Sequence, residues 1–351
     1  METRKIVKEY KNTNKKKKIF LYTVIVLVSI LILIIGFIVW FINDKLSKVQ
    51  RVEIDLEDIG VTQEAEENLV EYRNIALFGI DSREDEYSRG NRSDCIIILS
   101  INNKTNEAKI FSIYRDTYLQ IEGYGLDKVT HAYSYGEAPL ALKTLNTNLD
   151  LNIKEFVAVN FNSLATTINK LGGVTMNIEN DELKYINGYI DATSKNTGIS
   201  SSHVTQAGLQ KLDGVQAVAY SRIRYTEGGD YKRAERMRTV LVATIQEMKK
   251  KNIFELNDIA DEILPKVYTN ISSSEILSII PKIASYNIND NIGWPYETRG
   301  ITLDRWYGVP VTLENNVLKL HKEFFKQEDY VVPENIKEIS NQIINRTGYS
   351  E

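Results

Sequence analysis

The hydrophobic pattern opens with one long apolar run. Residues 19–41 contain no charged side chain, and a run of this length can cross a bilayer as a helix. Lysine and arginine dominate residues 1–18, which predicts that this tail stays in the cytoplasm and that the rest of the chain lies outside. The alternative is a cleaved signal peptide, but the run is long for a signal core and no small-residue cleavage pattern follows it. We therefore expect a single-pass protein of the cell membrane.

Short apolar segments follow a polar stretch. Residues 42–72 are rich in Asp and Glu and contain no proline, which predicts a partly helical stalk. Apolar runs at 74–80, 95–101 and 108–114 are typical of buried strands. The turn-rich residues 102–106 separate the last two runs and predict a hairpin.

Helices and strands then alternate. The predicted elements are a helix at 130–149, a strand at 156–160, a helix at 162–171, a strand at 174–178, and helices at 212–221, 231–251, 253–267 and 275–285. The stretch 179–205 is polar and is predicted to be irregular. This alternation predicts a layered α/β domain over residues 73–327, followed by a polar tail at 328–351.

Charge narrows the function classes. The first 18 residues carry +6 and the whole chain −4, so the remainder carries −10. An acidic external part argues against non-specific binding of nucleic acid. Cys95 is the single cysteine, and His131, His203 and His321 are scattered, so the chain predicts neither an internal disulfide nor a zinc site.

Arginines concentrate in one short segment of this acidic background, at Arg222, Arg224, Arg233 and Arg236, with Asp230 among them. Guanidinium groups bind phosphate in a bidentate manner, which favours a diphosphate ligand. Taken alone, such a cluster is more often a solvated helix with surface ion pairs.

Carboxylates stand at the ends of the predicted strands. Asp81 follows the first strand and Asp94 opens the second, so both meet at one end of the sheet if these strands are neighbours. One or two carboxylates together with phosphate oxygens commonly hold Mg²⁺. Each aspartate alone is better explained as a turn residue. Arg115 and Asp116 end the third strand, and alone they are equally well a buried ion pair.

These groups together supply what phosphoryl transfer requires. They offer a site for a divalent ion, guanidinium groups that stabilise the developing charge, and a carboxylate able to accept a proton.

A series of motifs follows in order along the chain: Phe78-Gly-Ile-Asp-Ser-Arg83, Arg92-Ser-Asp94, Ser112-Ile-Tyr-Arg-Asp116, His131-Ala-Tyr-Ser-Tyr-Gly136, Leu171-Gly-Gly-Val174, and Leu212-Asp-Gly-Val-Gln-Ala-Val-Ala-Tyr-Ser-Arg222 with Arg224, Asp230, Arg233 and Arg236. In this order they resemble the motifs of the LytR-CpsA-Psr proteins of bacterial cell envelopes, and the resemblance runs from about Ile75 to Phe325.

The resemblance implies an enzyme of cell wall assembly. Its substrate would be a glycopolymer, such as teichoic acid or capsule, linked by diphosphate to a polyprenyl lipid, and the acceptor would be peptidoglycan. The product would be a phosphodiester. The implied fold is a three-layer α/β/α arrangement with a mixed central sheet and an apolar tunnel for the lipid. Apolar residues of 138–171 would line this tunnel, or equally form ordinary core.

The resemblance also implies roles for site residues. Asp81 and Asp94 would position Mg²⁺ or Mn²⁺. The diphosphate would be held by Arg115, Arg222 and Arg224. The site would be shaped by Arg92, Arg233 and Arg236. Its organisation would depend on two further aspartates, Asp116 and Asp230. Met237 stands where the family usually has Gln, so an amide near the phosphates is missing and either acceptor positioning or substrate choice differs.

Two other function classes fit parts of the pattern. A polyprenyl diphosphate pyrophosphatase would use the same ion and arginines with water as acceptor. A non-enzymatic, membrane-bound envelope regulator is the second, although the chain shows no helix-turn-helix pattern or basic recognition helix.

Overall fold

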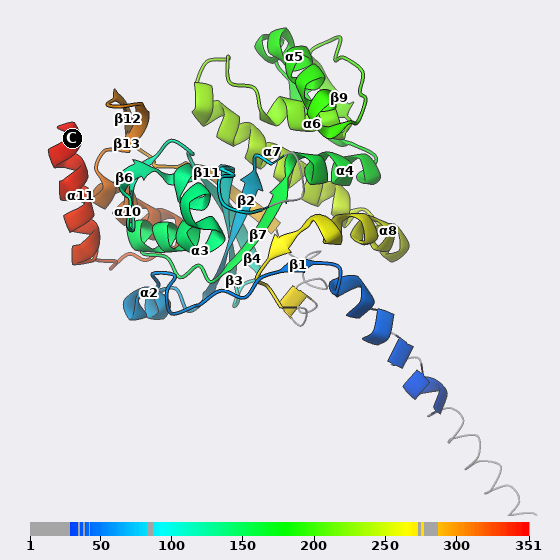
Figure 1. Ribbon diagram of the computed structural model, residues 1–351, viewed down its shortest axis with the longest axis horizontal. Coiled ribbons are helices and arrows are strands. Elements are labelled where there is room, and N and C mark those ends of the chain that lie inside the picture. Colours follow the sequence, from blue (N-terminus) through cyan, green and yellow to red (C-terminus); the bar gives the residue numbers. More distant parts are fainter. Residues whose placement is uncertain are drawn as a thin grey trace, which may run out of the picture. The chain divides into compact units, whose positions relative to one another are not determined.

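The computed structural model describes residues 29–33, 36–37, 39–41, 43–82, 87–272, 275–276 and 287–350 (Figure 1). The chain separates into two units, Met1–Lys48 and Val49–Glu351. Within the described residues, no helix combines the length and the apolar character that a membrane crossing requires. The membrane span predicted at 19–41 lies largely outside these residues.

A mixed sheet of seven strands among the described residues forms the centre of the second unit. Its order is β1 (Gln50–Arg51), β10 (Tyr268–Thr269), β7 (Glu155–Asn160), β2 (Tyr72–Ile80), β3 (Ser93–Asn102), β4 (Glu107–Ile113) and β11 (Asn287–Trp294). Strands β2, β4, β7 and β11 run in one direction and β3 runs against them. The predicted hairpin is confirmed as β3–β4.

Helices cover both faces of this sheet, and the α/β expectation is confirmed (Figure 1). The helices are α2 (Gln63–Asn68), α3 (Val129–Leu149), α4 (Phe161–Leu171), α5 (Asn180–Thr197), α6 (Gly214–Ser221), α7 (Gly229–Lys249), α8 (Ile253–Ile263), α10 (Leu313–Lys319) and α11 (Glu334–Thr347), with a 3₁₀ turn at Leu264–Lys266 and a π-helical turn at Leu320–Phe324.

Strand alternation decides which side chains face which helices. Phe78, Phe111 and Phe156 point to the face that carries α3 and are almost fully buried in the main core. Burying a side chain of this size stabilises the fold by about 1.5–3 kcal/mol relative to leaving it exposed. Ser112, the next residue in β4, points to the opposite face and accepts a hydrogen bond from Arg238 of α7.

A short hairpin, β5 (Tyr118–Ile121) and β6 (Gly125–Lys128), is tied to α3 through one carboxylate. Asp127 Oδ2 lies 2.8 Å from His131 Nδ1 and accepts a hydrogen bond of 2.7 Å from the Tyr135 hydroxyl. Burial would raise the pKa of Asp127, but the hydrogen bonds from His131 and Tyr135 outweigh it and bring that pKa to about 2. The His131–Gly136 motif therefore joins the hairpin to the helix.

A smaller lobe with its own apolar core contains α5, α6, β8 (Val174–Ile178) and β9 (Gly208–Leu212). Helix α6 packs directly on α4. A Cβ atom at Gly214 would lie 1.9 Å from the carbonyl oxygen of Ala165, so only glycine allows this contact. Strand β8 was predicted with the right bounds, whereas α5 fills much of the stretch predicted to be irregular.

Helix α5 was missed because its apolar positions are sparse. Ile186 and Ile190 are fully buried and four residues apart, but polar residues fill the positions around them. A capping box at Glu179 and Glu182 starts the helix and was not recognised.

The two ends of the second unit also differ from expectation. The predicted stalk, 42–72, contributes β1 to the sheet and the buried side chains of Ile59 and Leu69 to the core. The predicted polar tail, 328–351, contains α11, whose Ile336 and Ile343 belong to the same core. Their apolar residues are sparse among charged and polar ones, which hid their burial from sequence reasoning.

Two more strands were missed, β12 (Thr298–Thr302) and β13 (Trp306–Pro310), which form a separate antiparallel pair. The helix predicted at 275–285 lies outside the described residues except for 275–276, which are helical. Within 138–171, Leu142, Leu149 and Phe156 are buried in the main core, so the core interpretation holds for these three residues.

Candidate functional site

Strand directions bring the predicted site residues to one end of the sheet. Strands β2 and β4 end where β3 begins, because both run antiparallel to it. Asp81 therefore follows β2 beside Asp94 in β3, and Arg115 follows β4 at the same edge. Strand β7 is parallel to β2, so its end delivers Phe161, the first residue of α4, to this edge as well.

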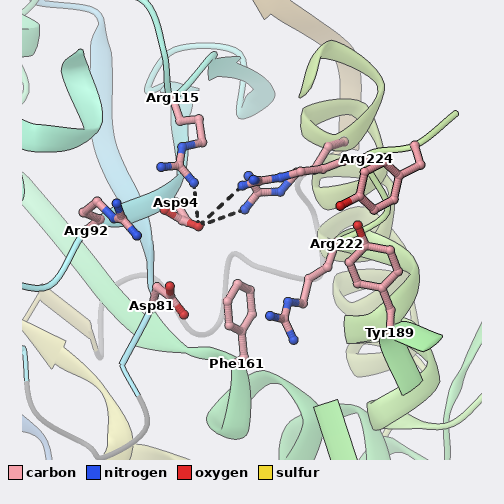
Figure 2. A pocket seen from close by; sticks show the side chains of 10 residues that line it. Asp81, Arg92, Asp94, Arg115, Phe161, Tyr189, Arg222 and Arg224 are labelled. Carbon is pink, nitrogen blue, oxygen red and sulfur yellow. Dashed lines mark hydrogen bonds and ion pairs between the residues drawn. The ribbon is translucent and has the colours of Figure 1, made fainter. Parts of the chain in front are cut away.

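A pocket of about 240 Å³ lies at this edge. Figure 2 shows Asp81, Arg92 and Arg115 on one side facing Arg222 and Arg224 on the other. The residues that line the pocket are Asp81, Arg92, Asp94, Arg115, Phe161, Tyr189, Arg222, Arg224, Tyr225 and Arg233. These side chains carry a formal charge of +3 in a chain whose net charge is −4. The positive charge of the pocket therefore favours an anionic ligand.

The carboxylate of Asp94 joins the arginines of the two sides. Its Oδ2 lies 2.8 Å from Arg115 Nη1 and 3.1 Å from Arg233 Nη2, and 3.9 Å from Arg224 Nη2 (Figure 2). Asp94 and Arg233 are buried, whereas the Arg224 side chain is 41% exposed. One buried carboxylate thus fixes two guanidinium groups and leaves the third open to the pocket.

Asp230 and Asp116 lie behind the lining residues. Asp230 Oδ1 is 3.2 Å from Arg224 Nε and 3.4 Å from Arg233 Nη1. Burial alone would raise the pKa of Asp230, but Arg224 and Arg233 hold it below its usual value. Asp116 Oδ1 lies 2.7 Å from Lys128 Nζ. Neither aspartate lines the pocket, but Asp230 contacts two arginines that do.

Arg222 projects into the pocket from the end of α6. Its Nη1 donates to Thr193 Oγ1 at 3.0 Å, and its guanidinium lies 5.1 Å from the centre of the Phe161 ring. Burial lowers the pKa of Arg222, Asp81 opposes that shift, and Arg233 adds to it by repulsion. Arg222 thus presents a positive charge to the pocket.

The donor set can accommodate a hard cation only with help from a ligand. Asp94 Oδ1 is buried and has no hydrogen-bond partner among the described residues, so one carboxylate oxygen is left over in an arginine-rich site. Asp81 is exposed and faces the same space (Figure 2). Within the described ranges, no group of three or more His, Cys, Asp or Glu side chains could hold a metal ion. A cation here would take further oxygen ligands from phosphate or water.

Arg236 does not reach the pocket. It is 1% exposed, and its Nε lies 2.6 Å from Glu182 Oε1. Its other nitrogens donate to the Ile223 carbonyl oxygen at 3.1 Å and to Thr226 Oγ1 at 2.6 Å. Arg236 therefore contacts the chain on both sides of Arg224, at the Ile223 backbone and at the Thr226 side chain. Sequence reasoning grouped it with the phosphate ligands because the pattern shows charge but not burial.

Met237 is buried as well, and it faces β3 and β4 beside Cys95 and Ile96, outside the lining of the main pocket. Burial raises the pKa of Cys95 to about 12, so that thiol stays neutral. The missing amide at position 237 thus leaves the residues that line the main pocket in place.

Sequence reasoning missed three aromatic lining residues, Phe161, Tyr189 and Tyr225. Phe161 follows a predicted strand at the sheet end, and Tyr225 follows Arg224, so both positions carried a usable signal. Tyr189 lies on α5, the helix that was not predicted, so the sequence pattern held no signal for it.

The Arg236–Glu182 pair gives a prediction for stability. Replacing Glu182 by Gln leaves the Arg236 charge buried without its partner, which should lower the free energy of unfolding by about 3–5 kcal/mol. Urea denaturation followed by circular dichroism measures this loss. Asp181→Asn, which removes an exposed pair with Lys184 on the same helix, is the control and should cost far less. Similar losses for both variants would contradict a clamping role of Glu182.

Known proteins are similar to this chain in sequence and in fold. A model of the LytR_cpsA_psr family matches residues 42–297. The chain is 33% identical over 234 residues to the polyisoprenyl-teichoic acid–peptidoglycan teichoic acid transferase TagT of Bacillus subtilis, which covers 65% of this chain and 70% of the relative. It is 29% identical over 280 residues to the Enterococcus faecalis transferase TagU, and this match covers 77% of this chain and 84% of the relative.

A solved structure of an Enterococcus faecalis protein described as a transcriptional regulator has a similar fold. Its TM-score is 0.60 at 23% identity, and the match covers 80% of this chain and 97% of that chain. The family match spans most of the second unit, including β2, β3, β4 and the arginine segment that together build the pocket. The chain belongs to the LytR-CpsA-Psr family.

Proposed function

We propose that this protein is a phosphotransferase that moves a glycopolymer from a polyprenyl diphosphate carrier to peptidoglycan. The observation that carries the proposal is the pocket in which five arginines surround two aspartates at one sheet end. The relatives named as polyisoprenyl-teichoic acid–peptidoglycan teichoic acid transferases support the same substrate classes.

The reaction follows from the charges in the pocket. An acceptor hydroxyl oxygen attacks the phosphorus that bears the glycan, and the bond from this phosphorus to the bridging oxygen breaks. Polyprenyl monophosphate leaves, and the hydroxyl proton passes to a base. Arg115 and Arg233 are held in place by Asp94, so they can stabilise the developing charge without reorganising. Arg222 and Arg224 face them across the pocket (Figure 2).

We propose that the lipid chain lies along the second face of the sheet. Leu77, Leu99, Val157 and Val159 lie on central strands and point away from the α3 core, and they are only half-buried. Phe78 and Phe156, on the other face of the same strands, are almost fully buried. Half-covered apolar side chains in the middle of a sheet suit a polyprenyl tail that lies between the sheet and its helices.

A prediction of transfer tests the function. The full chain in detergent, given a short polyprenyl diphosphate glycan, Mg²⁺ and peptidoglycan fragments, should form a glycan-phosphate adduct that mass spectrometry detects. Arg222→Lys keeps the charge but loses the planar fork, so kcat/KM should fall by about a hundredfold. Arg299→Lys, at an exposed position of β12, is the control and should leave the rate unchanged.

Other products would contradict the transferase. Release of polyprenyl monophosphate with a free glycan phosphate and no adduct would indicate a pyrophosphatase. Lipid that binds and stays intact would indicate a non-enzymatic role in the envelope.

We also propose that Asp81 and Asp94 hold Mg²⁺ together with diphosphate oxygens. This site is supported by the exposed Asp81 carboxylate and by Asp94 Oδ1, for which the part of the chain that the structure describes offers no hydrogen-bond partner. When bound, the ion would neutralise charge on the phosphate oxygens.

Metal dependence is the next prediction. Chelation should abolish transfer, and Asp81→Asn should reduce it by about a hundredfold, because a neutral amide binds Mg²⁺ poorly. Mn²⁺ titration followed by electron paramagnetic resonance, with a prenyl diphosphate present, should show a bound ion in the wild type and weaker binding in the variant. Asp191→Asn, on an exposed part of α5, is the control. Equal Mn²⁺ binding by wild type and Asp81→Asn would remove the metal assignment.

Residues 19–41 are proposed as the membrane anchor, with residues 1–18 in the cytoplasm and the second unit outside. The uncharged run and the basic tail support this topology. A reporter that is active only outside the cytoplasm should therefore be active when fused after the last residue. Removal of residues 1–41 should release the protein from the membrane fraction. An active cytoplasmic reporter at the same position would reverse the topology.

A further inference from the structure

Three tyrosines gather at one rim of the arginine pocket. Tyr185 and Tyr189 lie four residues apart on α5 and so share one face of the helix. The Tyr225 ring lies 5.8 Å from the Tyr185 ring and 6.4 Å from the Tyr189 ring, centre to centre. Tyr189 and Tyr225 line the pocket with the arginines. The three rings are called the tyrosine rim below.

The tyrosine rim is exposed although its backbone is fixed. Tyr225 is 72% exposed and Tyr185 is 37% exposed. Arg236 holds the Ile223 carbonyl oxygen on one side of Tyr225 and the Thr226 hydroxyl on the other. The Tyr225 ring is thus held beside the arginine pocket on a rigid segment. Because folding has already ordered this segment, ligand binding loses less conformational entropy.

The position of the rim selects its ligand. Tyr225 directly follows Arg224, so a group stacked on its ring lies next to a phosphate held by that guanidinium. In a diphosphate-linked glycan, the group bonded to the outer phosphate is the first sugar. The face of a pyranose ring that carries C–H bonds packs well on an aromatic ring, while its hydroxyls stay in water.

We infer that the tyrosine rim is the binding subsite for the first sugar of the donor glycan, with the Tyr225 ring as its main contact. This inference rests on the proposed function and adds a contact that discriminates a glycosylated carrier from a bare one.

Binding measurements test the subsite without depending on transfer. Calorimetry would titrate the full chain in detergent with farnesyl diphosphate and with farnesyl diphosphate that carries one hexose. In Tyr225→Ala the affinity for the glycosylated ligand should fall about tenfold, the scale of a good aromatic contact. The affinity for bare farnesyl diphosphate should change less than about twofold. Tyr225→Phe keeps the ring and should bind both ligands like the wild type.

Tyr124→Ala is the matched control, because Tyr124 is an exposed tyrosine stacked on Tyr135 and does not line the pocket. It should bind both ligands normally. Equal weakening of both ligands in Tyr225→Ala would overturn the subsite, since the ring would then serve the phosphates. Unchanged donor binding with a raised KM for peptidoglycan would overturn it in favour of the acceptor. A wild type that binds neither ligand would refute the proposed function itself.

Discussion

The repulsion between guanidinium groups is the constraint on which the site depends. Two unit charges 4 Å apart interact by about 4 kcal/mol at the effective dielectric constant near a protein surface. Five arginines around one pocket would therefore push the sheet end and α7 apart without a counter-charge. Asp94 supplies it from within β3, because it lies between Arg115 and Arg233 and contacts both. The same carboxylate that neutralises the arginines also binds the sheet to the helix that covers it.

A second ion pair sets the shape of the opposite wall. Arg236 and Glu182 are each 1% exposed and join α7 to α5. Such a buried pair contributes little net stability compared with an apolar pair, but it has one geometry in which both charges are satisfied. That geometry fixes the Ile223–Thr226 segment. Binding groups on this segment are thus placed by a residue that never touches the ligand.

Sequence reasoning reached the fold and the site to different depths. The strands β2, β3 and β4 were predictable because their apolar runs are nearly continuous, and Asp81, Asp94 and Arg115 followed from the strand ends. Helices α5 and α11 were not predictable, because each is buried only along a narrow stripe, and charged residues stand between the apolar residues of that stripe. The placement of Arg236 depends on burial by α5, so missing that helix also hid its contacts. The metal and substrate roles of the site residues remain predictions.

The packing of α11 has a consequence for the order of folding. Ile336 and Ile343, near the C-terminus, share one core with Ile59 and Leu69, near the start of the second unit. Contacts between residues so distant in sequence carry the largest cost of loop closure and form only when both segments are available. The core cannot close before α11 has been synthesised. Without α11 an apolar surface on α3 would be exposed, so this helix closes one side of the core.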